Sequence, residues 1–264
     1  MRNDYRKARA LVTGASSGIE EAFAKALAAR GCDLVLVARR QDRLDKLSEE
    51  LESGHGISCI TVPFDLSVQR PGIHLRALVD GDVDLLVNSA GFATQGPFVD
   101  GDADDFARVL AVDVGAVVDL CHAFLPGMVR RRRGAILNVC STTAYQPVPT
   151  LAVYAAAKAF VLSFSQSLWY EARQHGVTVL SFAPGPTHTE FFDVIGETAT
   201  AVGHLQSADQ VAAAGLRALD RRWTPPSAVS GVGNSIWAAL ARLTPRRVLM
   251  PALARSLRPV DSQR

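Results

Sequence analysis

The chain has 264 residues, of which 48% are hydrophobic and 20% are charged, and its formal net charge is +2. A chain of this length and balance buries a large core without disulfides, so a small disulfide-stabilised scaffold is excluded. No stretch approaches the ~18 uninterrupted apolar residues of a membrane helix, so a membrane-spanning chain is not expected either.

Short apolar runs alternate with amphipathic runs of helix length along the first 182 residues. The apolar runs predict strands at Ala8–Val12, Leu34–Ala38, Ile57–Val62, Val83–Val87, Ala135–Cys140 and Val177–Phe182. The amphipathic runs predict helices at Ile19–Arg30, Asp42–Leu51, Val68–Val79, Asp102–Arg131 and Leu151–His175. Nearly continuous apolar strands are typical of a sheet covered on both faces. The alternation predicts a single α/β domain, residues 1–264, with a doubly wound parallel sheet of the Rossmann type.

This pattern changes after the sixth predicted strand. Pro184–Gln206 is expected to be irregular, Ser207–Arg222 is expected to be helical, and residues 224–264 form a basic C-terminal extension. Residues 217–264 hold nine Arg and two Asp, a net charge of +7. Leu249, Leu253 and Leu257 recur in this extension at helical spacing. We expect them to pack on the domain or over its cleft, with contact to a membrane surface as the alternative.

A glycine-rich turn lies between the first predicted strand and the first predicted helix, with the sequence TGASSGI at residues 13–19. Gly14 permits a tight turn, and Gly18 lets the backbone approach a ligand closely. The helix N-terminus behind them offers free N–H groups and the positive end of a dipole to a pyrophosphate. The residues expected to hold a dinucleotide here are Gly14, Ser16, Ser17, Gly18 and Ile19.

Tyr154 and Lys158 form a Tyr-x-x-x-Lys pair at the start of the helix after the fifth predicted strand. The i, i+4 spacing stacks both side chains on one helix face. Hydride transfer at a carbonyl carbon needs a proton donor or acceptor at the oxygen, and a free tyrosine titrates near ~10. A Lys⁺ about 4 Å away is worth ~4 kcal/mol at an effective dielectric of ~20, enough to lower that pKa by ~3 units.

Two further motifs complete a recognisable set. Residues 88–91 match an N-x-A-G pattern after the fourth predicted strand, and residues 184–189 match P-G-x-x-x-T after the sixth. Together with TGASSGI and the Tyr-x-x-x-Lys pair, they resemble the short-chain dehydrogenase/reductase family. The resemblance covers residues ~8–195 densely and the C-terminal extension poorly.

The resemblance implies a role for each matching residue. Tyr154 would be the acid/base, Lys158 would lower its pKa and hold the ribose, and Ser141 would polarise the substrate oxygen. Asp113 stands where the family has an Asn that serves the reacting centre. The further residues that would bind cofactor are Asp65, Leu66, Asn88, Ala90, Gly91, Pro184, Gly185, Thr187 and Thr189, besides Tyr154 and Lys158.

Arg39 and Arg40 follow the second predicted strand, where no Asp or Glu is present at residues 38–40. An acidic residue here would accept hydrogen bonds from the ribose of NAD, whereas arginines pair with the 2′-phosphate of NADP. We therefore predict NADP(H) as cofactor. The alternative is that both arginines only begin a solvated helix.

Two positions depart from the family pattern. Glu20 stands where the family has a third glycine, and a carboxylate near a pyrophosphate is repulsive. Ser17 and Glu20 also fit a capping box, which is the interpretation we favour, with reduced cofactor affinity as the alternative. An ionised Asp113 would attract the charge of Lys158 and oppose the lowering of the Tyr154 pKa.

Partners and location follow from features outside these motifs. The cysteines show no C-x-x-C pair and lie in apolar runs, and the apolar run near the N-terminus is too short for a signal peptide, so we expect a cytoplasmic protein. The histidines show no metal spacing, and the run Arg130–Arg133 lacks an aromatic platform, so neither metal nor nucleic acid is expected. By analogy with the family we expect a homodimer or homotetramer.

These observations predict an NADP(H)-dependent oxidoreductase that interconverts an alcohol and a ketone or aldehyde. The aliphatic region after Gly185, which contains Phe191 and Phe192, indicates a fairly apolar small-molecule substrate. The alternative is a degenerate family member that binds cofactor or a partner without efficient turnover.

Overall fold

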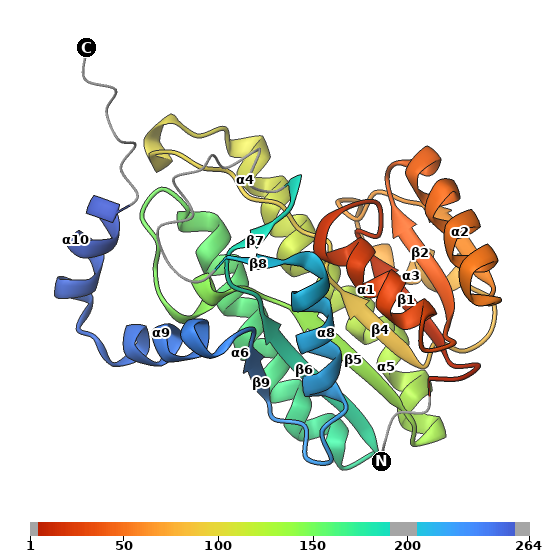
Figure 1. Cartoon of the computed structure of the whole chain (residues 1–264). Coiled ribbons are helices and arrows are strands. Elements are labelled where there is room, and N and C mark those ends of the chain that lie inside the picture. Colours follow the sequence, from red (N-terminus) through yellow and green to blue (C-terminus); the bar gives the residue numbers. More distant parts are fainter. Residues whose placement is uncertain (1–4, 191–204, 257–264) are drawn as a thin grey trace.

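The computed structural model describes residues 5–190 and 205–256. Within them, seven parallel strands form one sheet in the order β3-β2-β1-β4-β5-β6-β9 (Figure 1). The strands are β1 Arg9–Thr13, β2 Asp33–Ala38, β3 Cys59–Pro63, β4 Leu85–Asn88, β5 Gly134–Val139, β6 Val177–Ala183 and β9 Ser227–Val229. The strand order reverses between β1 and β4, and ligands of such sheets bind outside the carboxyl ends of the strands at this reversal.

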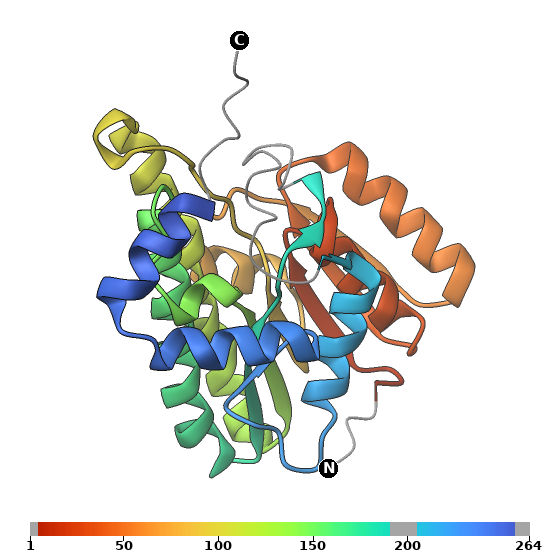
Figure 2. The ribbon, with the colours of Figure 1, turned by 60° about the vertical axis from the view of Figure 1, so that its left-hand side comes forward.

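The inner strands are almost wholly apolar because both faces of the sheet are covered. Leu11 of β1 is aligned with Val35 of β2 and with Leu86 of β4, and all three are fully buried. Helices α1, α2 and α8 pack on one face of the sheet, and helices α3, α5 and α6 pack on the other (Figures 1 and 2). Their bounds are α1 Gly18–Ala28, α2 Gln41–His55, α3 Pro71–Leu78, α5 Val117–Arg131, α6 Ala152–Arg173 and α8 Ala208–Leu219.

All six predicted strands are present, with bounds shifted by at most two residues. The prediction of an irregular Pro184–Gln206 is wrong at its two ends, where β7 Thr187–His188 pairs in parallel with β8 Gln206–Ser207. The seventh strand of the main sheet, β9, was not predicted, because three residues after a Pro-Pro pair are too short for a periodic signal.

The segment 224–264 also contains two helices that the sequence analysis did not predict, α9 Val232–Leu243 and α10 Arg246–Ser256. Leu249 and Leu253 of α10 are buried against Ala241 of α9, with Trp237 beside them. The expected packing of these leucines on the domain is therefore present, whereas Leu257 lies outside the described residues. In both views α10 lies at the opposite end of the molecule from α2 (Figures 1 and 2).

The predicted long helix Asp102–Arg131 is interrupted in the middle. Helix α4 spans Ala103–Leu110, a π-helical turn spans Ala111–Ala116, and α5 continues from Val117. Single π-helical turns inside α-helices are frequent at functional sites, and this one carries Asp113.

The stretch Ala103–Arg131 has a mean hydropathy of 1.7 over its most apolar window, and by length and composition alone it could cross a membrane. Leu120, Phe124 and Met128 of α5 are buried against the sheet in this structure. That packing is the arrangement of a core helix.

Candidate active site

A cavity of about 460 Å³ opens at the carboxyl ends of the strands on both sides of the β1–β4 reversal. Cavities of this size are typical of small-molecule sites. The predicted site residues that line it are Gly14, Ser16, Ser17, Gly18, Ile19, Arg39, Arg40, Asp65, Leu66, Ala90, Gly91, Ser141, Tyr154, Lys158, Pro184, Gly185, Thr187 and Thr189. Asn88 and Asp113 do not line the cavity, because they are buried beneath it with 2% and 0% exposure.

The turn between β1 and α1 has the backbone that its glycines predict. Gly14 and Gly18 have φ values of +80° and +68°, which favour glycine, and the N–H of Gly14 donates to the carbonyl of Val37 at 2.7 Å. Thr13 Oγ1 accepts from the N–H groups of Ser89 at 3.1 Å and Ala90 at 3.2 Å. These bonds tie the turn to the end of β4, so that the N-terminus of α1 faces the cavity.

The predicted capping box at the start of α1 is wrong. Ser17 is the N-cap residue, but its side chain makes no capping hydrogen bond. The Glu20 carboxyl turns instead toward the end of β4, where Oε1 accepts a hydrogen bond from Ser89 Oγ at 3.2 Å. Glu20 therefore lines the cavity, a location that the capping interpretation did not foresee.

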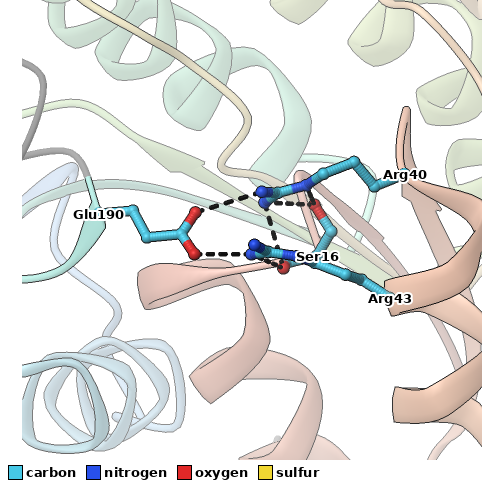
Figure 3. Close-up of polar contacts among 4 residues, drawn as sticks. All are labelled: Ser16, Arg40, Arg43 and Glu190. Atoms are coloured by element: carbon cyan, nitrogen blue, oxygen red, sulfur yellow. Dashed lines mark hydrogen bonds and ion pairs between the residues drawn. The ribbon is translucent and has the colours of Figure 1, made fainter.

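An arginine cluster, Arg40 and Arg43, lies beside the phosphate-binding turn (Figure 3). Arg40 donates to Ser16 Oγ from Nη2 at 3.1 Å and from Nε at 3.2 Å. Glu190 reaches both arginines, with Oε2 3.3 Å from Arg40 Nη1 and Oε1 2.6 Å from Arg43 Nη1. The Arg43 hydrogen bond holds the pKa of Glu190 below its usual range. Arg39 is exposed at the rim of the same cavity.

The sequence analysis did not select Arg43 or Glu190. For Arg43 a signal was present, because a residue three positions after Arg40 at the start of a helix shares its face. For Glu190 there was none, since it is 147 residues from Arg43 along the chain.

Asp65 and Leu66 follow β3 at the next edge of the cavity. Leu66 is 7% exposed, whereas the Asp65 carboxylate is at the surface and accepts from the N–H of Ser67 at 2.9 Å. That hydrogen bond, a second one from the Ser67 side chain and the charge of Arg39 hold the pKa of Asp65 below its usual range. An ionised acceptor at this edge is able to receive hydrogen bonds from a base or a ribose.

Tyr154, Lys158 and Ser141 meet where β5 and α6 face the cavity. Tyr154 is 8% exposed and Lys158 4%, and Lys158 Nζ lies 5.5 Å from the centroid of the tyrosine ring. Ser141 caps the short 3₁₀ helix Thr142–Tyr145, and its hydroxyl is hydrogen-bonded with Tyr154. A proton-transfer group, a cation and a hydroxyl thus lie together at one largely buried corner of the cavity.

Asp113 is buried beneath the cavity and contacts Lys158. Its Oδ1 lies 2.6 Å from Lys158 Nζ, and its Oδ2 accepts from the N–H of Phe92 at 3.1 Å. The side chain is fully buried. The Asp113–Lys158 attraction expected from the sequence is therefore a direct ion pair.

The pKa values of the pair Tyr154 and Lys158 reflect burial and these charges. Burial raises the pKa of Tyr154 to about 12, although the charge of Lys158 lowers it, and the Asp113 carboxylate raises it further. Burial lowers the pKa of Lys158, but Asp113 and Tyr154 raise it, and the result lies above the usual range. Lys158 thus lowers the pKa of Tyr154, as the sequence predicted, but burial raises that pKa by more.

A buried polar network supports the corner. Asn88 Nδ2 donates to Asn138 Oδ1 at 2.8 Å, and Asn138 Nδ2 donates to Ser165 Oγ at 2.9 Å. Ser165 in turn donates to the carbonyl of Val161 at 2.6 Å. The network joins β4, β5 and α6 through Asn88 and two residues that the sequence analysis did not select.

The P-G-x-x-x-T segment closes the cavity on the side of β6. Thr187 Oγ1 donates to the carbonyl of Gly185 at 2.9 Å, and Thr189 Oγ1 donates to the carbonyl of Thr187 at 3.4 Å. A Cβ on Gly185 would lie 2.1 Å from Nδ2 of Asn234 on α9, so this position requires glycine. Phe191 and Phe192, whose region in the sequence indicates an apolar substrate, lie outside the described residues.

No three His, Cys, Asp or Glu side chains among residues 5–190 and 205–256 converge to hold a metal ion. The site instead combines a glycine turn at the reversal of a parallel sheet with a tyrosine, a lysine and a serine at the next carboxyl ends. This combination defines an oxidoreductase that works with a nicotinamide dinucleotide.

Comparison with known proteins gives the family. Residues 8–200 match the model described as short chain dehydrogenase, and the chain belongs to the short-chain dehydrogenase/reductase family. The very-long-chain 3-oxoacyl-CoA reductase of Bos taurus is 37% identical over 180 residues, which cover 66% of this chain and 58% of that protein. The chain thus spans little more than half of the length of this relative.

Solved structures of the family cover more of the chain. A short-chain dehydrogenase from Sphingobium yanoikuyae in complex with NADPH has a TM-score of 0.80 and 31% identity, covering 97% of this chain and 98% of that one. L-Sorbose reductase from Gluconobacter frateurii, complexed with NADPH and L-sorbose, has a TM-score of 0.77 and 25% identity, covering 88% of this chain and 98% of that one. The doubly wound Rossmann-like fold predicted from the sequence is confirmed.

Proposed function

We propose that this protein is an NADP(H)-dependent oxidoreductase that interconverts an alcohol and a ketone or aldehyde. The observation that carries the proposal is the convergence of Tyr154, Lys158 and Ser141 on one cavity that is also lined by the phosphate-binding turn and by Arg40 of the arginine cluster. Two structural neighbours that are complexed with NADPH support the choice of cofactor.

The residues present fit a dinucleotide. A Cβ on Gly14 would lie 3.0 Å from the Cα of Ala90, so this position of the turn requires glycine. The N-terminus of α1 offers free N–H groups and a positive dipole end to the pyrophosphate. The arginine cluster offers fork-shaped donors to a 2′-phosphate, and no acidic residue occupies 38–40.

The remaining chemistry belongs to side chains of this chain. Bound NADPH supplies the hydride. The Ser141 hydroxyl orients the carbonyl oxygen of the substrate beside Tyr154, whose neutral phenol donates a proton to that oxygen. Lys158 holds its positive charge next to the phenol and favours the tyrosinate that remains. For alcohol oxidation the same groups work in reverse, and Tyr154 must then be ionised.

The substrate side of the cavity is apolar. Phe92, Val148, Leu151 and Leu253 line it, and Leu253 comes from α10 in the C-terminal extension. Apolar walls around a few polar groups favour a substrate with an apolar body and one reacting oxygen. We propose a ketone or aldehyde of this kind, and the naming of one relative as a very-long-chain 3-oxoacyl-CoA reductase is compatible with it.

The test measures cofactor binding and turnover together. Dissociation constants for NADPH and NADH are measured by fluorescence, and NADPH oxidation is followed over a panel of aliphatic, aromatic and cyclic ketones. We expect at least tenfold tighter binding of NADPH, and we expect Arg40→Ala or Arg43→Ala to remove most of that preference. Equal affinities in the native protein would contradict the cofactor assignment.

The location of Glu20 in the cavity favours one second candidate, a member that binds cofactor without efficient turnover. That candidate predicts stoichiometric NADPH binding and no oxidation with any ketone of the panel. Turnover with one ketone that is lost in Tyr154→Phe would reject it.

A further inference from the structure

Glu20 fills space that the two glycines of the phosphate-binding turn leave open. Its Cγ lies 2.8 Å from the position of a Cβ on Gly14, and its Oε2 lies 2.9 Å from the position of a Cβ on Gly18. Missing side chains at these glycines are what let a phosphate approach the backbone. The carboxyl of Glu20 therefore occupies the approach that an anion would use.

The surroundings of Glu20 favour its neutral form. It comes from the first turn of α1, and two hydrogen bonds lower its pKa, one from its own backbone N–H and one from Ser89 Oγ at the end of β4 to Oε1 at 3.2 Å. The charged groups that act on it are Lys158 of α6, which lowers its pKa, and Asp113 of the π-helical turn, which raises it. The uncharged side chain of Thr189, which follows β7, lies next to Gly18, as the Glu20 carboxyl does. Burial outweighs the lowering effects and raises the pKa of Glu20 to about 7.

We infer that Glu20 couples dinucleotide binding to the uptake of a proton, so that the protein binds its cofactor with the Glu20 carboxyl protonated. The inference rests on the proposed function, because it concerns the pyrophosphate of the same dinucleotide. An ionised carboxylate and a pyrophosphate held at the same turn repel each other. A protonated carboxyl carries no charge and also gains an O–H donor.

The expected pH dependence follows from linkage. Below pH 7, Glu20 of the free protein is already protonated, so cofactor binding takes up no proton and the affinity for the cofactor does not depend on Glu20. Above pH 7, each unit of pH weakens binding about tenfold, until the pH passes the higher pKa that Glu20 has in the complex. The affinity of the native protein for the dinucleotide is therefore expected to fall as the pH rises above 7.

The experiment measures the dissociation constant of NADPH by fluorescence from pH 6 to pH 9 for the native protein and for Glu20→Gln. We expect the native affinity to fall at least tenfold between pH 7 and pH 8.5, and the Glu20→Gln affinity to change less than threefold. The 2′-phosphate titrates near ~6 in both cases, so the difference between the two proteins isolates Glu20.

A second measurement counts protons directly. Calorimetric titration with NADP⁺ at pH 8, in two buffers with different heats of ionisation, gives the number of protons taken up on binding. We expect approximately one proton for the native protein and approximately none for Glu20→Gln. Glu21→Gln is the matched control, because Glu21 is the next residue on α1 but pairs with Lys25 at 2.9 Å on the outer surface. It should behave as the native protein does.

The outcomes separate the two proposals. If native protein and Glu20→Gln share one pH profile and take up the same number of protons, the role of Glu20 is overturned while the proposed function stands. If Glu20→Gln binds cofactor and the native protein binds only at low pH, the inference is supported. If neither protein binds NADPH or NADH at any pH, both the proposed function and the role of Glu20 are overturned.

Discussion

Replacing Asp113 with Asn tests how the buried ion pair controls Tyr154. The carboxylate lies 2.6 Å from Lys158 Nζ, which itself lies 5.5 Å from the centroid of the Tyr154 ring. These two distances place the carboxylate at most about 8 Å from the ring. At an effective dielectric of ~20, a unit charge at about 8 Å is worth ~2 kcal/mol, or ~1.5 pKa units.

The sign follows from the charge that is removed. An ionised Asp113 disfavours the tyrosinate, so Asp113→Asn should lower the pKa of Tyr154 from about 12. Alcohol oxidation needs the tyrosinate, and its rate rises with pH up to this pKa. The midpoint of the pH–rate profile should therefore move down by ~1 unit or more, and the rate at neutral pH should rise about tenfold.

The assay follows initial rates of alcohol oxidation from pH 6 to pH 10 at saturating cofactor and alcohol, a range below both expected midpoints, in which a lower pKa of Tyr154 gives a higher rate at every pH. Absorbance of the ionised phenol, taken as the difference from Tyr154→Phe, gives the pKa independently of turnover. Asp105→Asn is the matched control, because this carboxylate is exposed on α4 and pairs with Arg108. Its profile should not move.

Two results would refute the reasoning. Burial raises the pKa of Asp113 and Lys158 lowers it, so a carboxyl kept neutral by burial would leave the midpoint unchanged. The same result is expected if only the backbone of residue 113 matters. A lower rate in Asp113→Asn would show that the carboxylate holds Lys158 in place and thereby assists turnover.

Three further perturbations check separate parts of the site. Tyr154→Phe should reduce turnover to less than about a tenth while leaving the dissociation constant of NADPH within about twofold, and a faster variant would exclude the acid/base role. Glu190→Gln should release the arginine cluster, so NADPH binding should tighten about threefold or more in low salt while NADH binding stays unchanged. Fluorescence titrations of both cofactors test this, and an equal change in both affinities would contradict it. Ser165→Ala should lower the free energy of unfolding by ~1–3 kcal/mol in denaturant titrations, because it leaves Asn138 Nδ2 buried without its acceptor, and an unchanged midpoint would mean that the network relaxes.

The sequence predicted those parts of the fold whose signals are local. Strands β1 to β6 appear as short apolar runs because both faces of each are covered, and α1, α2, α5 and α6 appear as amphipathic runs. The reacting groups could be predicted from the sequence in the same way. Tyr154 and Lys158 are one helical turn apart, and the glycine turn lies within seven residues. Motifs at the ends of parallel strands necessarily meet at one edge of the sheet.

The contacts that distinguish this site were decided by the tertiary structure. Glu20 satisfied the local pattern of a capping box, yet its carboxyl bonds to Ser89, 69 residues away. Glu190 reaches the arginine cluster across 150 residues from Arg40, and Asn234 fixes Gly185 from a segment that had no periodic signal. Even Tyr154, whose motif was evident, has a pKa set mainly by burial.

The difference between what the sequence predicted and what only the tertiary structure decided has a physical reason. Periodicity and turn chemistry depend on a few consecutive residues, so the sequence by itself determined the βα alternation, the phosphate-binding turn and the Tyr–Lys pair. A side chain with two possible hydrogen-bond partners bonds to the one that the tertiary structure places within reach. The desolvation that shifts a pKa likewise depends on all the residues that cover the titrating group. The side-chain direction of Glu20, the ion pair of Asp113 and the placing of Leu253 from α10 in the cavity wall could be decided only by the folded molecule.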